Sequence, residues 1–236
     1  MKMSDSERCA SGITGFDALC QGGFVRDSVN TVMGGPGAGK SLFLLQFLWN
    51  GVTKFDENGL YLSLEPDVMD IFNDAREMGW DFSKYDAGGQ CKFMKINASS
   101  VVDGSIKPEI TKLISKFEIK RICMDPVSVL SMSVEKEHQM RATIYDLVSM
   151  FKRLGVTVLL SDETETTSVG TPLNDSVDKD LFLKFLSDGL VELYTMGLGG
   201  ESDRAIRISK MRRTNHAMGP VPLLISSKGL VVDSKG

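Results

Sequence analysis

The chain has 236 residues, of which 42% are apolar and 25% charged, and this composition excludes a disordered, collagen-like or disulfide-scaffold protein. The formal net charge of −4 excludes an overall basic surface for nucleic acid or anionic membranes. The charge is uneven, because residues 201–236 hold seven Lys or Arg against three Asp or Glu. An anion-binding surface is therefore expected in this last segment.

The cysteines and the first residues bear on the cellular environment. Cys9, Cys20, Cys91 and Cys123 show no C-x-x-C spacing, which excludes a zinc site or a thioredoxin-type redox motif, and Cys123 is expected in the core. Residues 1–7 lack the apolar stretch of a signal peptide, and no run approaches membrane-spanning length. We therefore predict a reduced, soluble, cytoplasmic protein without a membrane segment.

Short apolar runs alternate with amphipathic segments through the first two thirds of the chain. The apolar runs predict strands at Val29–Met33, Leu60–Leu64, Phe93–Ile96, Arg121–Met124 and Val156–Leu160. Apolar residues at helical spacing predict helices at Ser41–Trp49, Asp67–Met78, Pro108–Phe117 and Glu135–Leu154. Such alternation is typical of an α/β fold with a mostly parallel sheet and helices on both of its faces.

The pattern changes after the last of these strands. Asp162–Asp180 holds six acidic residues and one Lys, and it is predicted to be a long loop, which in compact proteins is usually functional or disordered. The later apolar runs predict antiparallel hairpins that extend the sheet, at Leu190–Tyr194, Ala205–Met211, Pro222–Ile225 and Leu230–Val232. No repeat or linker-like composition interrupts the chain, so residues 1–236 are predicted to form one domain.

A glycine-rich segment between the first strand and the first helix carries the strongest functional signal. Residues 34–41 read Gly-Gly-Pro-Gly-Ala-Gly-Lys-Ser and match the phosphate-loop pattern G-x-x-x-x-G-K-[ST]. Glycines let backbone N–H groups surround a phosphate. Lys40 is expected to bridge the β- and γ-phosphates, and the Ser41 hydroxyl is expected to ligate Mg²⁺. The alternative is a glycine-rich turn that contains Lys-Ser by chance, and the strand before it and the helix after it argue against this. The predicted nucleotide-binding residues are Gly35, Pro36, Gly37, Ala38, Gly39, Lys40, Ser41 and Leu42.

Three carboxylates follow predicted strands. Asp125 closes the strand Arg121–Met124 and is the expected second Mg²⁺ residue beside Ser41, acting through the ion's water shell. An Asp at this place is common without function, but a phosphate loop upstream favours the metal role. Glu65 and Glu163 are candidates for the group that activates water, and a solvated strand-end Glu is the alternative for each.

Several segments in the same order resemble the KaiC-like group of RecA-superfamily ATPases, which includes RadA paralogues. They are Ser11-Gly12-Ile13-Thr14-Gly15-Phe16-Asp17-Ala18-Leu19 with Gly22-Gly23, then Leu64-Glu65-Pro66, then residues 204–212 (RAIRISKMR) with His216, and residues 225–229 (ISSKG). The resemblance covers nearly the whole chain. It implies a RecA-like P-loop NTPase core in a single KaiC domain of archaeal type, with the strand ending at Ser161 between those ending at Met33 and Met124.

The resemblance also assigns roles. It implies ATP and Mg²⁺ bound between subunits of a homo-oligomer, often a hexamer, with Glu65 as the catalytic base. Lys210 and Arg212 would then reach the γ-phosphate of a neighbouring subunit, completing a catalytic set with Lys40 and Glu65. The alternative drawn from the residues alone is that the basic side chains form the solvated face of an edge strand, where positive charge discourages aggregation. His216 is expected to serve packing or a turn.

Two departures from the group's pattern limit what is carried over. Pro66 replaces a second Glu, which is expected to weaken hydrolysis, and Lys184 and Phe185 stand where the circadian clock protein carries a Ser-Thr autophosphorylation pair. A clock-type autokinase is therefore not expected.

Three functions are weighed on this basis. The first is an active Mg²⁺-dependent ATPase, and the second is a nucleotide-gated assembly or signalling module with little turnover and an unidentified protein partner. The third, a DNA recombination or repair protein, is disfavoured because the predicted loop at Asp162–Asp180 is acidic and repels phosphates. A salt titration of single-stranded DNA binding tests the third, which fails if no binding occurs at low salt.

Overall fold

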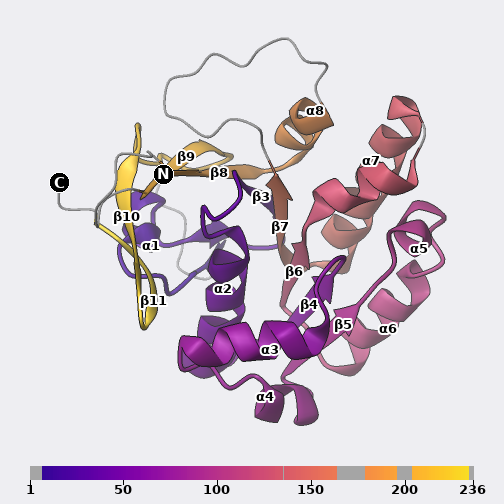
Figure 1. Cartoon of the computed structure of the whole chain (residues 1–236). Helices are drawn as coiled ribbons and strands as arrows, with labels where there is room; N and C mark the ends of the chain where they lie inside the picture. Colours follow the sequence, from indigo (N-terminus) through magenta and orange to yellow (C-terminus); the bar gives the residue numbers. More distant parts are fainter. Residues whose placement is uncertain (1–6, 135, 164–178, 196–203, 234–236) are drawn as a thin grey trace.

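The computed structural model describes residues 7–134, 136–163, 179–195 and 204–233. A nine-stranded sheet runs through the described part in the order β11-β10-β9-β8-β3-β7-β6-β4-β5 (Figure 1). Its strands are β3 (Val29–Gly34), β4 (Gly59–Ser63), β5 (Cys91–Lys95), β6 (Arg121–Asp125), β7 (Thr157–Glu163), β8 (Gly189–Thr195), β9 (Arg204–Met211), β10 (Val221–Ser226) and β11 (Gly229–Val232). A separate two-stranded sheet pairs β1 (Arg8–Cys9) with β2 (Phe24–Val25).

The sheet is parallel in one part and antiparallel in the other. Strands β5, β4, β6, β7, β3 and β8 run parallel, whereas β9, β10 and β11 pair antiparallel. Strand β7 lies between β3 and β6, which is the order that the RecA resemblance implied. The predicted antiparallel extension at the C-terminal end is also confirmed.

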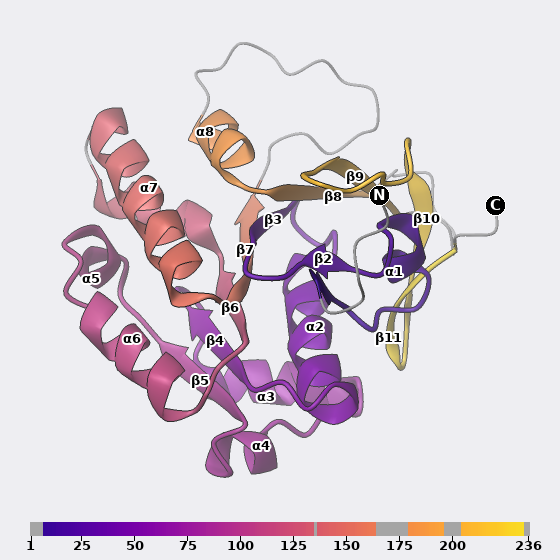
Figure 2. The ribbon, with the colours of Figure 1, turned by 180° about the vertical axis from the view of Figure 1, so that it is seen from behind.

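Helices cover both faces of the parallel strands (Figures 1 and 2). The helices are α1 (Phe16–Leu19), α2 (Lys40–Lys54), α3 (Val68–Glu77), α4 (Ser83–Ala87), α5 (Ala98–Val102), α6 (Lys107–Lys116), the 3-10 helix η2 (Val127–Ser133), α7 (Glu137–Leu154) and α8 (Lys179–Leu186). Helices α2 and α3 pack on one face, and α5, α6, α7 and α8 pack on the other. None of the helices in the described ranges has the length and apolar character needed to cross a membrane.

Alternate residues of the inner strands enter two different cores. On β6, Cys123 packs with α2 on one face, while Ile122 and Met124 pack with α6 and α7 on the other, and all three are fully buried. Because successive side chains of a strand point to opposite faces, a strand covered on both sides must be apolar throughout. This explains the continuous apolar runs in the sequence and confirms the predicted core position of Cys123.

Some elements differ from the sequence prediction. Helix α8 is not among the predicted helices, and its first two residues fall within the expected loop Asp162–Asp180, of which residues 164–178 lie outside the described part. The helix has eight residues, and such a short helix is marginal in isolation. Leu183, which is buried, and the partly buried Phe182 and Leu186 anchor it in the core that α7 also lines. Tertiary packing therefore stabilises this element.

A buried ion-pair network joins helix α2 to the start of β6. The Arg121 side chain is 1% exposed, and its Nε donates a 2.6 Å hydrogen bond to Glu57 Oε2. Its Nη1 donates to the Phe47 carbonyl of α2 at 3.0 Å, and Arg26 pairs with the other Glu57 oxygen at 2.6 Å. Burial alone raises the pKa of Glu57, but the two guanidinium groups outweigh burial and lower it. Glu57 is thus the charge partner of an arginine that has no access to water.

Candidate functional site

The predicted phosphate loop connects a buried strand to a buried helix. Strand β3 ends at Gly34, helix α2 begins at Lys40, and the loop between them contains Gly37 at φ 74° and Gly39 at φ 102°. Side chains with a Cβ rarely adopt these angles, so both positions favour glycine. Pro36 and Gly37 are exposed, as is Ser41 on the first turn of α2, while Ala38 is buried. The loop and the first turn of α2 are thus partly exposed to solvent, and the N-terminus of a helix favours an anionic ligand.

The Lys40 ammonium is folded onto its own loop. Its Nζ donates to the carbonyls of Gly34 at 2.9 Å and Gly35 at 3.1 Å, and it lies 3.7 Å from Glu163 Oε1. Gly34 and Glu163 are register partners in β3 and β7, so the pairing of these strands brings Glu163 to the loop. The structure thus brings the candidate Glu163 to the lysine that is predicted to contact phosphate.

We expect Glu163→Gln to tighten the binding of ADP measured without Mg²⁺ by about threefold. The Glu163 carboxylate competes with phosphate for Lys40 and repels the ligand, and because it is 54% exposed, solvent screens the effect to a modest size. Isothermal titration calorimetry measures the change. Glu109→Gln, an equal charge change on the exposed surface of α6, should leave the affinity unchanged. Weaker binding in Glu163→Gln would show that Glu163 assists the ligand instead.

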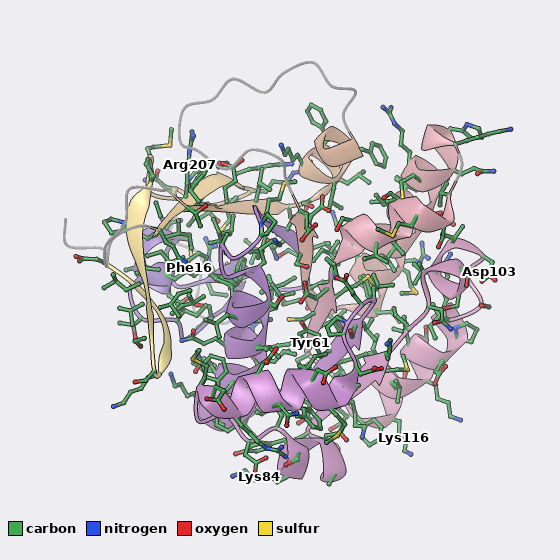
Figure 3. The ribbon with its side chains drawn as sticks, viewed as in Figure 1. Phe16, Tyr61, Lys84, Asp103, Lys116 and Arg207 are labelled. Atoms are coloured by element: carbon green, nitrogen blue, oxygen red, sulfur yellow. The ribbon has the colours of Figure 1, made fainter. Side chains whose placement is uncertain are left out.

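Asp125 is a buried carboxylate at the end of β6. Its Oδ2 accepts a 2.5 Å hydrogen bond from the Tyr61 hydroxyl of β4, and its Oδ1 accepts one from the Ser161 hydroxyl of β7. Burial, followed by the nearby Asp125 charge, raises the pKa of Tyr61 well above its ordinary value, so the phenol stays a donor. Tyr61 lies in the interior of the molecule, at the centre of Figure 3. Two neighbouring strands therefore orient the predicted metal residue.

Glu65 lies just beyond β4 at the same edge of the sheet. The backbone here is tied to β6, since Leu64 N donates to the Asp125 carbonyl at 2.9 Å, and Ser63 Oγ donates to the Pro66 carbonyl at 2.6 Å. The Glu65 side chain is exposed. Glu65 therefore directly follows Leu64, whose backbone contacts Asp125, and the Glu65 side chain faces solvent.

The two predicted intersubunit residues lie at the other end of the sheet. Gly189 of β8 pairs with Asn30 at the start of β3 and with Met211 at the end of β9. Arg212 therefore lies five residues before Gly34 in register, roughly 16 Å along the strand direction at about 3.3 Å per residue. An arginine side chain does not span this distance. Arg212 and Lys210 are not brought together with the phosphate loop of their own chain.

Lys210 and Arg212 differ in their surroundings. Lys210 Nζ donates to the carbonyls of Lys184, Phe185 and Ser187 at 3.1, 3.1 and 2.7 Å, at the C-terminal end of α8, where a cation is favourable. Burial, then the nearby Arg212 cation, lowers the pKa of Lys210. The Arg212 side chain is 56% exposed. The edge-strand alternative therefore does not describe Lys210, and β9 is not an edge strand, because it pairs with both β8 and β10. The Arg207 side chain, labelled in Figure 3, is exposed.

Sequence reasoning missed several residues of the site. Arg204, at the opposite end of β9 from Arg212, donates through Nε to the carbonyl of Gly37 in the phosphate loop at 3.4 Å. The sequence pattern identifies Tyr61 and Ser161 only as strand residues, yet both bind Asp125. A signal existed for Ser161 alone, because a polar residue at the end of an apolar strand next to β3 is placed near the loop. His216 contacts the Ala217 carbonyl through Nδ1 at 3.0 Å, a local contact that fits the predicted turn role.

The chain is similar to known proteins over nearly its whole length. The chain is 28% identical to a circadian clock oscillator protein KaiC of Prochlorococcus marinus over 98% of its own length and 46% of that protein. It is 30% identical to the KaiC of Synechococcus elongatus over 92% of its length and 42% of that protein. The chain thus spans about half the length of these curated relatives.

A solved structure and a family model extend the comparison. The crystal structure of a KaiC-like protein from the hyperthermophilic archaeon Pyrococcus horikoshii OT3 superposes with a TM-score of 0.83 at 28% identity, covering 96% of this chain and 98% of that one. The family model described as "ATPase: KaiC" matches residues 9–236. The α/β architecture is the RecA-like KaiC fold, and the chain belongs to the KaiC family of ATPases.

Proposed function

We propose that this chain binds ATP with Mg²⁺ and hydrolyses it at the subunit interfaces of a homo-oligomer. The observation that carries the proposal is the division of charged residues between the two ends of the sheet. Lys40, Asp125 and Glu65 follow parallel strands at one edge, whereas Arg212 lies at the opposite end, beyond reach of that edge. Arg212 does not reach the phosphate loop of its own chain. In the proposed oligomer, Arg212 of a second copy completes the site at that loop.

The residues at the loop edge fit ATP and Mg²⁺. Ser41 is exposed at the start of α2, and the two hydroxyl donors hold Asp125 in place as an acceptor. Mg²⁺ keeps several waters and phosphate oxygens and needs few protein ligands, so Ser41 and Asp125 would be enough to hold it. The ion would neutralise charge on the β- and γ-phosphates.

The chain's own residues then divide the work. The loop N–H groups and Lys40 hold the β- and γ-phosphates, and Glu65 accepts a proton from the attacking water. The water oxygen bonds to the γ-phosphorus while the bond from that phosphorus to the bridging oxygen breaks, giving ADP and phosphate. Arg212 of one copy stabilises the charge that develops on the γ-phosphate of the next. Lys210 could act beside Arg212 only if its ammonium left the three carbonyls at the C-terminal end of α8.

We expect wild-type protein to turn over ATP, and Glu65→Gln to bind ATP normally while kcat falls on the order of 10²-fold or more, because the proton acceptor is lost. Phosphate release and ATP affinity are measured in parallel. Molar mass in solution should rise from about 25.9 kDa to a multiple of it on adding ATP–Mg²⁺. A monomer under both conditions would exclude the intersubunit role of Arg212.

The low-turnover assembly module is the second candidate. Pro66 stands where the family's second Glu is expected, which favours weak hydrolysis. Background phosphate release from both wild type and Glu65→Gln, combined with ATP binding and nucleotide-dependent assembly, would select this function over the active ATPase.

A further inference from the structure

Asp188 is a partly buried carboxylate in the turn between α8 and β8. Its backbone N donates to the Val29 carbonyl at 2.7 Å, and its Oδ2 accepts from Val29 N at 3.1 Å. Both polar backbone groups of the first residue of β3 are therefore bound to Asp188. Its side chain is 14% exposed, so the carboxylate is fixed to the strand that leads to the phosphate loop.

The same residue holds Arg212 at two points. Arg212 N donates to the Asp188 carbonyl at 2.8 Å, and Arg212 Nη1 lies 3.5 Å from Asp188 Oδ1. Lys152, from the last turn of α7, pairs with the same carboxylate at 2.9 Å. One residue thus contacts both the backbone and the side chain of Arg212.

The Asp188 carboxylate is the counter-charge for several cations near Arg212. Burial, then the nearby Arg212 and Lys152 cations, lower the pKa of Lys210, so the three cations lie close to one another. Without Asp188 they would repel the guanidinium from this position. An arginine side chain loses considerable rotamer freedom when it is fixed, and a partner that already restricts it lowers the cost of aiming it at a ligand.

We propose that Asp188 is a positioning residue that holds the Arg212 guanidinium in the orientation needed to reach the nucleotide of a neighbouring copy. This inference rests on the proposed intersubunit hydrolysis. It assigns Asp188 no contact with ATP. Its effect is therefore expected on the chemical step and not on the nucleotide affinity of the chain that carries it, because misplacing a catalytic group mainly slows the chemistry.

The test is Asp188→Asn, which keeps an acceptor for Val29 N and removes the charge. We expect kcat for ATP hydrolysis to fall about tenfold, with ATP affinity and the mass of the ATP-bound oligomer unchanged. In the Arg212→Ala background, single-turnover measurements should show no further loss, because there is no guanidinium left to position. Lys152→Met removes the other ion pair of the same carboxylate, and its kcat should stay within about twofold of wild type.

The outcomes separate this inference from the proposed function. A kcat of Asp188→Asn within about twofold of wild type, or a full further loss in the Arg212→Ala background, overturns the positioning role. If Arg212→Ala itself turns over ATP normally, the intersubunit role of Arg212 fails first. If Asp188→Asn does not assemble, Asp188→Glu is used: it keeps the charge but moves it by one methylene, and we expect a several-fold loss of kcat that unchanged turnover would contradict.

Discussion

Arg212→Ala is expected to lower kcat for ATP hydrolysis on the order of 10³-fold, as loss of an arginine finger does, without weakening ATP binding. The physical reason is distance, because Arg212 lies roughly 16 Å from its own phosphate loop along the strand direction. In the proposed oligomer it would act only on the nucleotide of a neighbour. Steady-state hydrolysis and ATP titration measure the two effects. Arg153→Ala removes an exposed cation from the end of α7 and should leave both unchanged.

Mixing two inactive variants tests the intersubunit role directly. Glu65→Gln lacks the proton acceptor but keeps Arg212, and Arg212→Ala has the reverse defect. When the two co-assemble at random, about one interface in four combines an intact Glu65 with an intact Arg212 from the neighbour, as head-to-tail contacts require. Roughly a quarter of wild-type activity should return. Activity no greater than the sum of the separate variants would place both residues in the same chain's site or remove Arg212 from the reaction.

Glu57→Gln should lower the free energy of unfolding by about 3 kcal/mol, because it leaves the guanidinium of Arg121 buried without a counter-charge. Arg121 is 1% exposed, and Glu57 is only 12% exposed. Urea unfolding followed by circular dichroism measures the loss, and the denaturant slope should not change. Asp146→Asn breaks an exposed pair with Lys107 and should cost about 0.5 kcal/mol or less.

The same interaction predicts a pH dependence. The pKa of Glu57 is lower in the folded state than in the unfolded state, where it is about 4.3. The ionised Glu57 therefore contributes fully to the free energy of unfolding above the unfolded-state pKa. This contribution is lost as pH falls through the folded-state pKa. Wild-type stability should decrease below about pH 4, and Glu57→Gln should show a flatter profile there. A double variant tests the same ion pair. Glu57→Gln combined with Arg121→Met should recover stability relative to Glu57→Gln alone, since no unpaired charge remains. If Glu57→Gln lowers the free energy of unfolding by less than about 1 kcal/mol, Arg121 has found another partner.

Much of the fold was predictable because its signals are local. The apolar runs at Val29–Met33 and Arg121–Met124 are continuous because both faces of these strands are buried, and the structure confirms them as β3 and β6. Helix α6 was predicted from Pro108 at its first turn, and it begins at Lys107. Helix α8 was missed because an eight-residue helix is too short to be stable by itself and depends on tertiary contacts of Leu183 and Lys210.

The candidate site also has a part that the sequence predicts and a part that depends on tertiary contacts. The phosphate loop is contiguous, so one stretch of sequence specifies its strand, its glycines at positive φ, its lysine and its helix. Asp125 and Glu65 were predictable as strand ends. Their surroundings were not, because the Tyr61 hydroxyl comes from 64 residues away in sequence and the Ser161 hydroxyl from 36.

The sequence by itself determined the α/β class, the phosphate loop and the candidate carboxylates, because each depends on neighbouring residues and on the periods of strand and helix. Only the tertiary structure decided which distant groups meet. Strand order and register brought Glu163 to Lys40, Arg204 to the loop and Asp188 to Arg212, and they separated Arg212 from the loop of its own chain. Contacts of this kind depend on how whole strands pair and pack, and no single stretch of sequence specifies that pairing.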